Sequence, residues 1–374
     1  MRRAWPLLAL VLVGCRHEYT WGSFEPTPPP EDDHGLWLSA DAAPGGGLAF
    51  AFYDRTRTAL GFAVARNVGD VLSWDVEKVD GYPSSDGLDS GDRGTFCSMK
   101  VAPSGVVWIS YHDATNGALR VVRRPTGSQP WDEPMLVDGG SGAHPRTGMF
   151  TSLAFDSAGF PVVAYHDDAA GTLRIAHTSD GTTWQTDTAW TGQPGPDGAA
   201  ADVGEFASLV IVDGVESIAF YDRANGDLHL LQGTAGSYSD TVVDSTGDTG
   251  QWPSLWTDGT TLRIAYQEVT NQDLRLATRS GAGAFQIETV DDGLYRGADS
   301  ALFERDGEPQ IVYFDGHENN MMLATPSGSQ WALTLLGGED SALGFFNEVV
   351  QADGHWWAAS YDYTKRQIFT RKLD

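Results

Sequence analysis

The sequence predicts an all-β fold, a ring of seven four-stranded antiparallel sheets, and three observations support this prediction. A frame of roughly 46 to 59 residues recurs seven times along the 374-residue chain. Each copy consists of short apolar runs separated by Gly, Asn and Asp, which favour turns between strands. The second run of every copy ends on an acidic residue, so the copies share one register. Four short strands in each of seven copies are typical of a seven-bladed β-propeller.

The acidic residue is the most regular feature of the frame, and an apolar residue follows it six positions later in every copy. The acidic residues are Asp54, Asp113, Asp167, Asp222, Glu268, Asp315 and Asp362. The apolar residues are Leu60, Leu119, Leu173, Leu228, Leu274, Met321 and Ile368. Because catalysis needs one site and not seven, we interpret the carboxylate as a structural group that accepts hydrogen bonds from turn amides or from a serine. The alternative is a ring of carboxylates that binds a cation or repeated ligands.

A serine lies 14 or 15 residues before the acid in six copies, and an asparagine takes its place in the seventh. These residues are Ser39, Ser98, Ser152, Ser208, Ser254, Ser300 and Asn347. An aromatic residue usually lies two positions earlier, at Trp37, Phe96, Phe150, Phe206, Trp252 and Phe345, whereas the sixth copy has Ala298. If Ser152 starts the first strand and Asp167 ends the second, the hairpin should make them near-opposite neighbours.

Glycines and a second aromatic residue delimit the remaining strands of each copy. Ala158-Gly159 predicts a turn between the first two strands. Asn116-Gly117 and Asn225-Gly226 predict tight turns between the second and third strands, because both residue types tolerate positive φ. A second aromatic residue predicts the start of the fourth strand, at Trp74, Trp131, Trp184, Tyr238, Phe285 and Trp331.

The seventh copy ends at Asp374, before any fourth strand, so that strand must come from elsewhere. A propeller hides its edge strands by joining its first blade to its last. We predict that residues 19–24, around Trp21, complete blade seven, and that the Pro-rich residues 25–35 form a loop between blades. The alternative is that the Pro-rich residues form a flexible linker tethering the domain.

The N-terminus predicts a signal peptide over residues 1–14, followed by one propeller domain over residues 15–374. Two arginines precede the apolar residues 4–13, a run too short to span a bilayer. The following residues, Leu12-Val13-Gly14-Cys15, resemble the bacterial lipobox. This resemblance implies cleavage before Cys15, acylation of Cys15 and a lipid anchor in the membrane. Arg16, in place of an Asp, favours the outer membrane of the bacterial cell envelope. The alternative is an ordinary secretory signal with a chance cysteine.

The net charge of −27 argues against nucleic acid and anionic lipid as direct partners, because such a surface repels both. It is also compatible with cation binding, and residues 86–92 (DGLDSGD) have acidic spacing similar to a calcium loop without its full pattern. We therefore expect no cofactor, with Ca²⁺ as the alternative. The remaining cysteine, Cys97, is expected to be unpaired and buried.

Two groups of side chains are candidates for ligand binding. Arg93, Arg146 and Arg296 precede the first strands of their copies and are candidates for an anion site. His112 and His166 hold equivalent places in adjacent copies, with His144 between them, and could ligate a metal together with Asp113 and Asp167. The alternative for both groups is that repetition alone brings them together as ordinary loop and packing residues.

Residues 178–184, "TSDGTTW", resemble the Asp-box turn of sialidase-like (BNR repeat) propellers. The matching residues are Thr178 or Ser179, Asp180, Gly181, Thr183 and Trp184. The resemblance implies the fold and a structural turn, and only this copy carries a near match. A sialidase also needs three arginines, a Tyr–Glu pair and an acidic acid/base, and no Arg-Ile-Pro-like sequence lies near the first copy.

Three functions follow from these patterns. Repetition without a singular residue set favours a non-catalytic binding or scaffold module for a protein or a glycan. The alternatives are a sialidase-like or other glycan-processing enzyme with its site at the axial mouth, and a lectin with aromatic pockets between blades. Fold alone does not choose among them.

Overall fold

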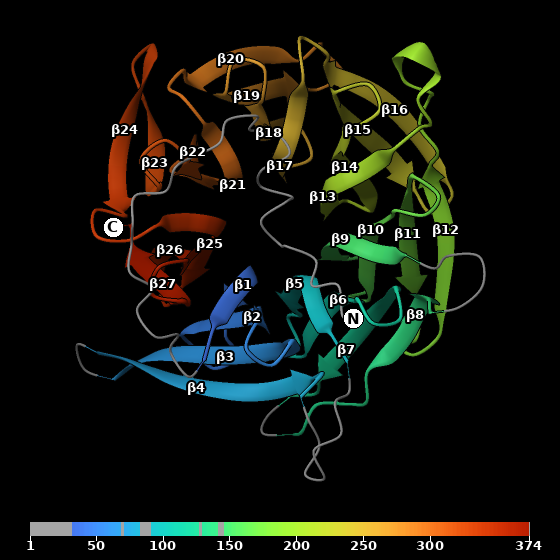
Figure 1. Ribbon diagram of the computed structural model, residues 1–374, viewed down its shortest axis with the longest axis vertical. Helices are drawn as coiled ribbons and strands as arrows, with labels where there is room; N and C mark the ends of the chain where they lie inside the picture. The colour runs from blue at the N-terminus through green and yellow to red at the C-terminus, as the bar shows by residue number, and fades with distance from the viewer. Residues whose placement is uncertain (1–31, 69–70, 83–90, 127–128, 141–145, 374) are drawn as a thin grey trace, which may run out of the picture.

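The computed structural model describes residues 32–68, 71–82, 91–126, 129–140 and 146–373. They form seven antiparallel sheets around a central axis (Figure 1). Six sheets have four strands in chain order, and the last described sheet has three. The predicted all-β, seven-bladed propeller is confirmed. Among the described residues, no helix has the length and apolar character needed to cross a bilayer.

The first four blades have the following strands. Blade one contains β1 (His34–Ala42), β2 (Leu48–Asp54), β3 (Ala59–Val68) and β4 (Val71–Asp80). Blade two contains β5 (Arg93–Val101), β6 (Val107–Asp113), β7 (Ala118–Arg124) and β8 (Met135–Gly139). Blade three contains β9 (Thr147–Phe155), β10 (Pro161–Asp167), β11 (Thr172–Thr178) and β12 (Trp184–Trp190), followed by a short 3-10 helix (Pro196–Gly198). Blade four contains β13 (Val203–Val212), β14 (Val215–Asp222), β15 (Asp227–Thr234) and β16 (Ser237–Asp244).

The last three blades repeat this plan. Blade five contains β17 (Thr249–Thr257), β18 (Thr261–Glu268), β19 (Asp273–Ser280) and β20 (Gln286–Asp291). Blade six contains β21 (Arg296–Arg305), β22 (Glu308–Asp315), β23 (Asn320–Ser327) and β24 (Gln330–Gly337). Blade seven contains β25 (Leu343–Ala352), β26 (His355–Asp362) and β27 (Gln367–Lys372). The first strand of each blade lies nearest the axis, and in the six blades with four described strands the fourth lies on the rim (Figure 1).

The second strand of each blade is the most deeply buried. All seven residues are buried in β2, β6 and β10, because neighbouring blades cover both faces of these strands. This coverage explains why the second strands are continuous apolar runs and do not alternate with polar residues. The core accordingly lies between blades, as in the cluster that joins Phe62 of blade one to Met99 and Ile109 of blade two.

The acidic residue of the frame closes the turn between the second and third strands of its blade. Asp167 Oδ1 accepts the Ala170 N–H at 3.1 Å, and equivalent carboxylate–amide bonds occur in all seven blades. A tyrosine one or two positions before the acid bonds to a neighbouring blade: the Tyr165 hydroxyl donates to Asp138 of blade two at 2.7 Å. The same kind of bond is made by Tyr53, Tyr111, Tyr221, Tyr266, Tyr313 and Tyr361. The Tyr and Asp of the frame are therefore structural.

The expectation that Ser152 and Asp167 are near-opposite neighbours is wrong. Asp167 pairs with Thr147 and Ser152 pairs with Ala164, because the first strand begins five residues before the serine. The serine instead joins neighbouring blades, since Ser152 Oγ accepts the Leu209 N–H of blade four at 2.9 Å. The same bond to the next blade is made by Ser39, Ser98, Ser208 and Ser254.

Blade seven meets blade one directly. The Tyr361 hydroxyl donates to Asp33 at 2.6 Å, and the His34 N–H donates to the Arg366 carbonyl at 3.2 Å. The predicted closing strand, residues 19–24, lies outside the described residues and stays a prediction. Of the predicted 25–35 loop, residues 25–31 also lie outside, and the structure places residues 34–35 in β1.

The structure describes one of the two cysteines, Cys97. Cys97 is buried and unpaired, as expected, and its thiol donates to the Trp37 carbonyl at 2.8 Å. Burial raises the pKa of this thiol far above its usual value, which makes it unreactive. Cys15 and the signal peptide lie outside the described residues.

Candidate functional site

The innermost strand of every blade carries a one-residue bulge that aims one side chain at the axis. In blade one, Leu36 pairs with Tyr53 and Ser39 pairs with Ala51, so β1 has one more residue than β2 over this stretch. The residue in the bulge has a left-handed backbone, with φ between 47° and 55° in all seven blades. A non-glycine residue in this region is strained, and such strain gathers at functional sites. The seven bulge residues are Trp37, Phe96, Phe150, Phe206, Trp252, Asp299 and Phe346.

Six of these bulge residues are aromatic, and together we call them the aromatic ring. Neighbouring members have ring centroids 4.6 to 5.8 Å apart, from Phe346 through Trp37 around to Trp252. This is the range in which aromatic pairs attract each other. Blade six interrupts the series with Asp299, which lies between Trp252 and Phe346 in blade order.

The registers expected for blades six and seven were therefore wrong by one residue. The bulge residue of blade six is Asp299, not Ala298, and that of blade seven is Phe346, not Phe345. The positions equivalent to the serine are accordingly Ala301 and Glu348. A serine one position early and a second phenylalanine concealed this shift in the sequence.

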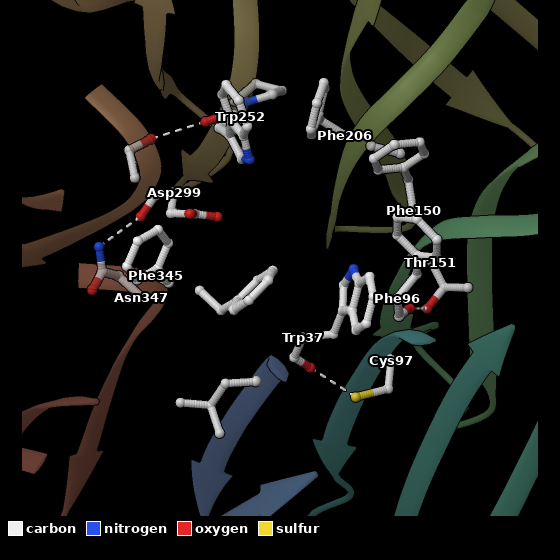
Figure 2. Close-up of a pocket in the computed structure, with 15 residues that line it drawn as sticks. Trp37, Phe96, Cys97, Phe150, Thr151, Phe206, Trp252, Asp299, Phe345 and Asn347 are labelled. Atoms are coloured by element: carbon white, nitrogen blue, oxygen red, sulfur yellow. Dashed lines mark hydrogen bonds between the residues drawn. The ribbon is translucent and has the colours of Figure 1, made fainter. Parts of the chain in front are cut away.

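The aromatic ring surrounds a cavity of about 250 Å³ (Figure 2). All seven blades contribute to its lining, and the bulge residues are half-buried around it. Hydrogen bonds between adjacent blades hold the backbone of the ring. Thr151 Oγ1 donates to the Phe96 carbonyl at 2.7 Å, and Asn347 Nδ2 donates to the Asp299 carbonyl at 2.9 Å. The cavity is therefore a preformed apolar site with a single acidic side chain in its ring.

A second, more polar chamber of about 540 Å³ adjoins this cavity along the axis. The serine positions line it, and Lys100 and Glu348 are its charged residues among those described. In blade seven, Glu348 holds the position that a serine has in other blades. Its carboxylate accepts hydrogen bonds from the Ser39 hydroxyl and from the Ala40 amide.

Both axial carboxyls have raised pKa values. Removal from bulk water raises the pKa of Asp299 to about 7, and a hydrogen bond from the Phe346 amide offsets only part of this rise. Removal from water likewise raises the pKa of Glu348 to about 7, against the opposing charge of Lys100. Each group is therefore divided between its acid and its carboxylate near neutral pH, which suits hydrogen bonding to a ligand or proton transfer.

The three predicted arginines lie at or just before the first strands of their blades, next to acidic residues. Arg93 Nη1 lies 2.8 Å from Asp80 and its Nε lies 3.4 Å from Asp113. Arg296 pairs with Asp291 and Asp315, and Arg146 pairs with Asp168 at 2.7 Å. Their charges are already neutralised by these partners. Anion binding by the three arginines stays a prediction.

The predicted histidines are buried behind the aromatic ring. His112 Nδ1 donates to the Thr147 carbonyl at 2.9 Å, and His166 Nδ1 donates to the Val203 carbonyl at 3.0 Å. Burial lowers the pKa of both imidazoles, so both are neutral near pH 7. Each therefore connects its blade to the next, whereas His144 lies outside the described residues.

The two predicted aspartates stabilise turns of the repeated frame. Asp113 accepts from Asn116 and from Arg120, with Arg120 Nε at 2.6 Å, and Asp167 closes its own turn. Of the predicted calcium loop, residues 86–90 lie outside the described part of the chain, and Asp92 accepts the Tyr53 hydroxyl at 2.9 Å.

A cluster with metal-ligand chemistry does form at His166, but with other partners. One ligand atom each from His166, Asp202 and Glu205 lies within 4.8 Å of the others. Burial raises the pKa of Glu205 to about 7, against the opposing charge of Arg223. The sequence did not indicate Asp202 and Glu205, because they belong to the next blade and occur in no repeated pattern.

The turn that resembles an Asp-box is a compact, self-bonded loop between β11 and β12. Asp180 Oδ1 accepts the Thr183 N–H at 2.6 Å and the Thr182 N–H at 2.7 Å. These two amides lower the pKa of the Asp180 carboxyl far below its usual value. The side chain therefore serves the turn, as the resemblance implies.

Comparison with known proteins identifies the fold and no family. No family model matches the sequence, and no curated protein matches it. The polysaccharide lyase Uly1 superposes with a TM-score of 0.59 at 9% identity, over 98% of this chain and 95% of that one. The Hadza microbial sialidase Hz136 superposes with a TM-score of 0.51 at 14% identity, over 90% of this chain and 65% of that one. This chain thus spans just under two thirds of that sialidase. At such identity the likeness establishes a shared fold only.

Proposed function

We propose that this chain is a glycan-binding lipoprotein of the bacterial cell envelope, and that its propeller binds a sugar in the axial cavity. The N-terminal sequence supports a lipid on Cys15 that anchors the protein, with the outer membrane as the expected location. The aromatic ring interrupted by Asp299 is the observation that carries the binding proposal.

The composition of the cavity suits a saccharide. Aromatic faces can cover the apolar C–H face of a sugar ring, and a carboxyl can bond to its hydroxyls. A concave, mostly apolar site with few polar groups is typical of small-ligand sites. A volume of about 250 Å³ is small for such a site, which favours a terminal sugar over an internal segment of a chain.

The solved propellers named above support this proposal by analogy. One is named as a polysaccharide lyase and another as a sialidase, and both names refer to glycans. A third match, to prolyl endopeptidases, has a TM-score of 0.52, so the fold also occurs in proteins whose names do not refer to glycans. The proposal therefore rests on the cavity and takes only secondary support from the fold.

A glycan array probed with the full-length chain tests the proposal. Trp252→Ala should weaken binding of any retained glycan at least tenfold, because it removes one aromatic face of the cavity. Trp74→Ala is the matched control, since Trp74 lies on the outer strand β4 and is 40% exposed. Binding that survives both substitutions would place the glycan elsewhere. No binding to any glycan would favour the scaffold role for a protein partner.

The second candidate is a glycan-processing enzyme with its site at the same axial mouth. The raised pKa of Asp299 favours it, because a carboxyl that keeps its proton near pH 7 can act as a general acid. Mass spectrometry of a retained glycan after incubation separates the two functions. Enzymatic action would yield a shortened product, and Asp299→Asn would abolish that product while leaving binding in place. An intact glycan would support binding alone.

A further inference from the structure

The cluster around His166 lies one layer outside the aromatic ring. His166 is at the end of β10 in blade three, Asp202 directly precedes β13 in blade four, and Glu205 lies within β13. The His166 ring lies 6.2 Å from the ring of Phe150, and Glu205 directly precedes Phe206. The cluster is therefore separate from the axial cavity, although it packs behind two members of the aromatic ring.

The hydrogen bonds of His166 leave one nitrogen facing two carboxylates. Its Nδ1 donates to the Val203 carbonyl, which leaves the lone pair on Nε2. The side chain is only 1% exposed, and Nε2 has no hydrogen-bond partner among the described residues. Nε2 lies 3.6 Å from Asp202 Oδ1, and that oxygen is also buried without a hydrogen-bond partner. Two lone pairs that face each other in a buried site repel, and a proton, a water molecule or a metal ion between them removes this repulsion.

The spacing and chemistry of the three groups suit a metal ion. Ligands bound at about 2.0 to 2.2 Å in a tetrahedron lie roughly 3.4 Å apart, close to the 3.6 Å between His166 Nε2 and Asp202. The Glu205 carboxylate completes a set whose atoms all lie within 4.8 Å. A ligating histidine usually donates its other ring N–H to a backbone carbonyl, as His166 does. One nitrogen and two oxygens suit a first-row transition metal, whereas Ca²⁺ and Mg²⁺ prefer oxygen alone.

We propose that His166 Nε2, Asp202 and Glu205 form a binding site for a divalent transition-metal ion such as Zn²⁺, which joins blade three to blade four. Three protein ligands leave at least one coordination position for water or another ligand. The half-exposed Arg223 lies 3.3 Å from Glu205 and 3.7 Å from Asp202, so it competes with the metal for these carboxylates.

The neighbouring blade provides a matched control. His112 is equivalent to His166, and its Nδ1 makes the same kind of bond to the next blade. Arg146 and Met149 take the places of Asp202 and Glu205 beside it. The frame therefore holds a buried histidine in both blades, and among the described residues His166, unlike His112, belongs to a cluster of three ligand atoms within 4.8 Å of one another.

Calorimetric titration of ZnCl2 into the full-length, EDTA-treated chain at pH 7.5 tests this site. We expect one equivalent of Zn²⁺ to bind and to raise the Tm by a few degrees, because a ligand that binds only the folded state stabilises it. Co²⁺ should bind at the same site and give a visible absorption spectrum, and millimolar Ca²⁺ or Mg²⁺ should not displace it. His166→Gln should abolish binding, Asp202→Asn and Glu205→Gln should weaken it at least tenfold, and His112→Gln should leave it unchanged.

The Arg223→Ala variant should change the affinity for Zn²⁺ in the opposite direction to the ligand variants. Removal of this competing cation should tighten Zn²⁺ binding several-fold, an effect that a purely structural role of the carboxylates would not produce. If His166→Gln does not fold, Asp202→Asn and Glu205→Gln decide the question, since neither removes the His166–Val203 bond. Absence of stoichiometric binding by the unmodified chain would overturn the proposal. Equal binding by the ligand variants and by the unmodified chain would overturn it too.

Discussion

Asp299 is the one bulge residue that is acidic, whereas the other six are aromatic. Its backbone has the same left-handed conformation as the six aromatic bulge residues, so it holds the equivalent position in its blade. Its side chain is nevertheless acidic and half-buried, with a pKa raised to about 7. A residue that costs stability in an otherwise regular ring is a candidate for function, because stability alone would favour a seventh aromatic side chain there.

The raised pKa of Asp299 predicts a specific pH dependence of stability. Between about pH 4 and pH 7 the folded chain holds this proton and the unfolded chain has released it, so the free energy of unfolding falls as the pH rises through this window. Asp299→Asn removes the titration. We expect the variant to gain about 2 kcal/mol over the parent at pH 8, less than the full shift implies because the cavity admits water. The advantage should disappear near pH 4.

Urea unfolding of both chains from pH 4 to pH 8 measures this difference. Asp306→Asn controls for the loss of one negative charge from the same blade, at an exposed turn position. A constant difference between the Asp299 variant and its parent over this range would contradict the raised pKa.

The element that organises the site is the bulged first strand. Its bulge aims a side chain at the axis, and the serine two positions later accepts an amide from the first strand of the next blade. These serine bonds act between blades, where no strand ladder exists to satisfy the amide. The same element therefore builds the cavity and joins the blades around it.

Ser152→Ala tests the role of the serine. It leaves the Leu209 N–H without a partner inside the protein, so we expect the free energy of unfolding to fall by about 1 to 2 kcal/mol. Ser157→Ala, in the exposed turn between β9 and β10, makes the same chemical change without removing such a bond and should be neutral. Equal stability of the two variants in urea unfolding would show that the serine bond contributes nothing.

At the scale of the whole molecule, the question is how the ring closes. Blade seven has three described strands, and β27 is the outermost of them. Contacts of Tyr361 and Arg366 with the start of blade one already join the two ends of the described ring. A fourth strand from residues 19–24 would pair the open edge of β27, which would otherwise present unpaired backbone groups.

Deletion of residues 17–24 tests this closure. If the segment supplies the fourth strand, the deletion should lower the free energy of unfolding by about 2 kcal/mol or more and the Tm by several degrees. Replacement of residues 26–30 by Gly and Ser at constant length is the control, since it alters only the Pro-rich segment. Thermal unfolding that is the same for the parent and for both variants would favour the flexible linker.

The sequence by itself determined the number of blades, the turns and the structural role of the repeated acid. These features depend on contacts between residues close in the chain, such as Asp167 with Ala170. Such contacts recur at the same spacing in every copy, so the repeated sequence reveals them. The tertiary structure alone decided which residues share a site. Asp299 joins the aromatic ring, and Asp202 and Glu205 join His166, across blade boundaries where no short-range pattern specifies the partner. Asp299 was concealed in the sequence because Ala298 and Ser300 fit the frame one position early, and the true register depends on how the first strand pairs with the second.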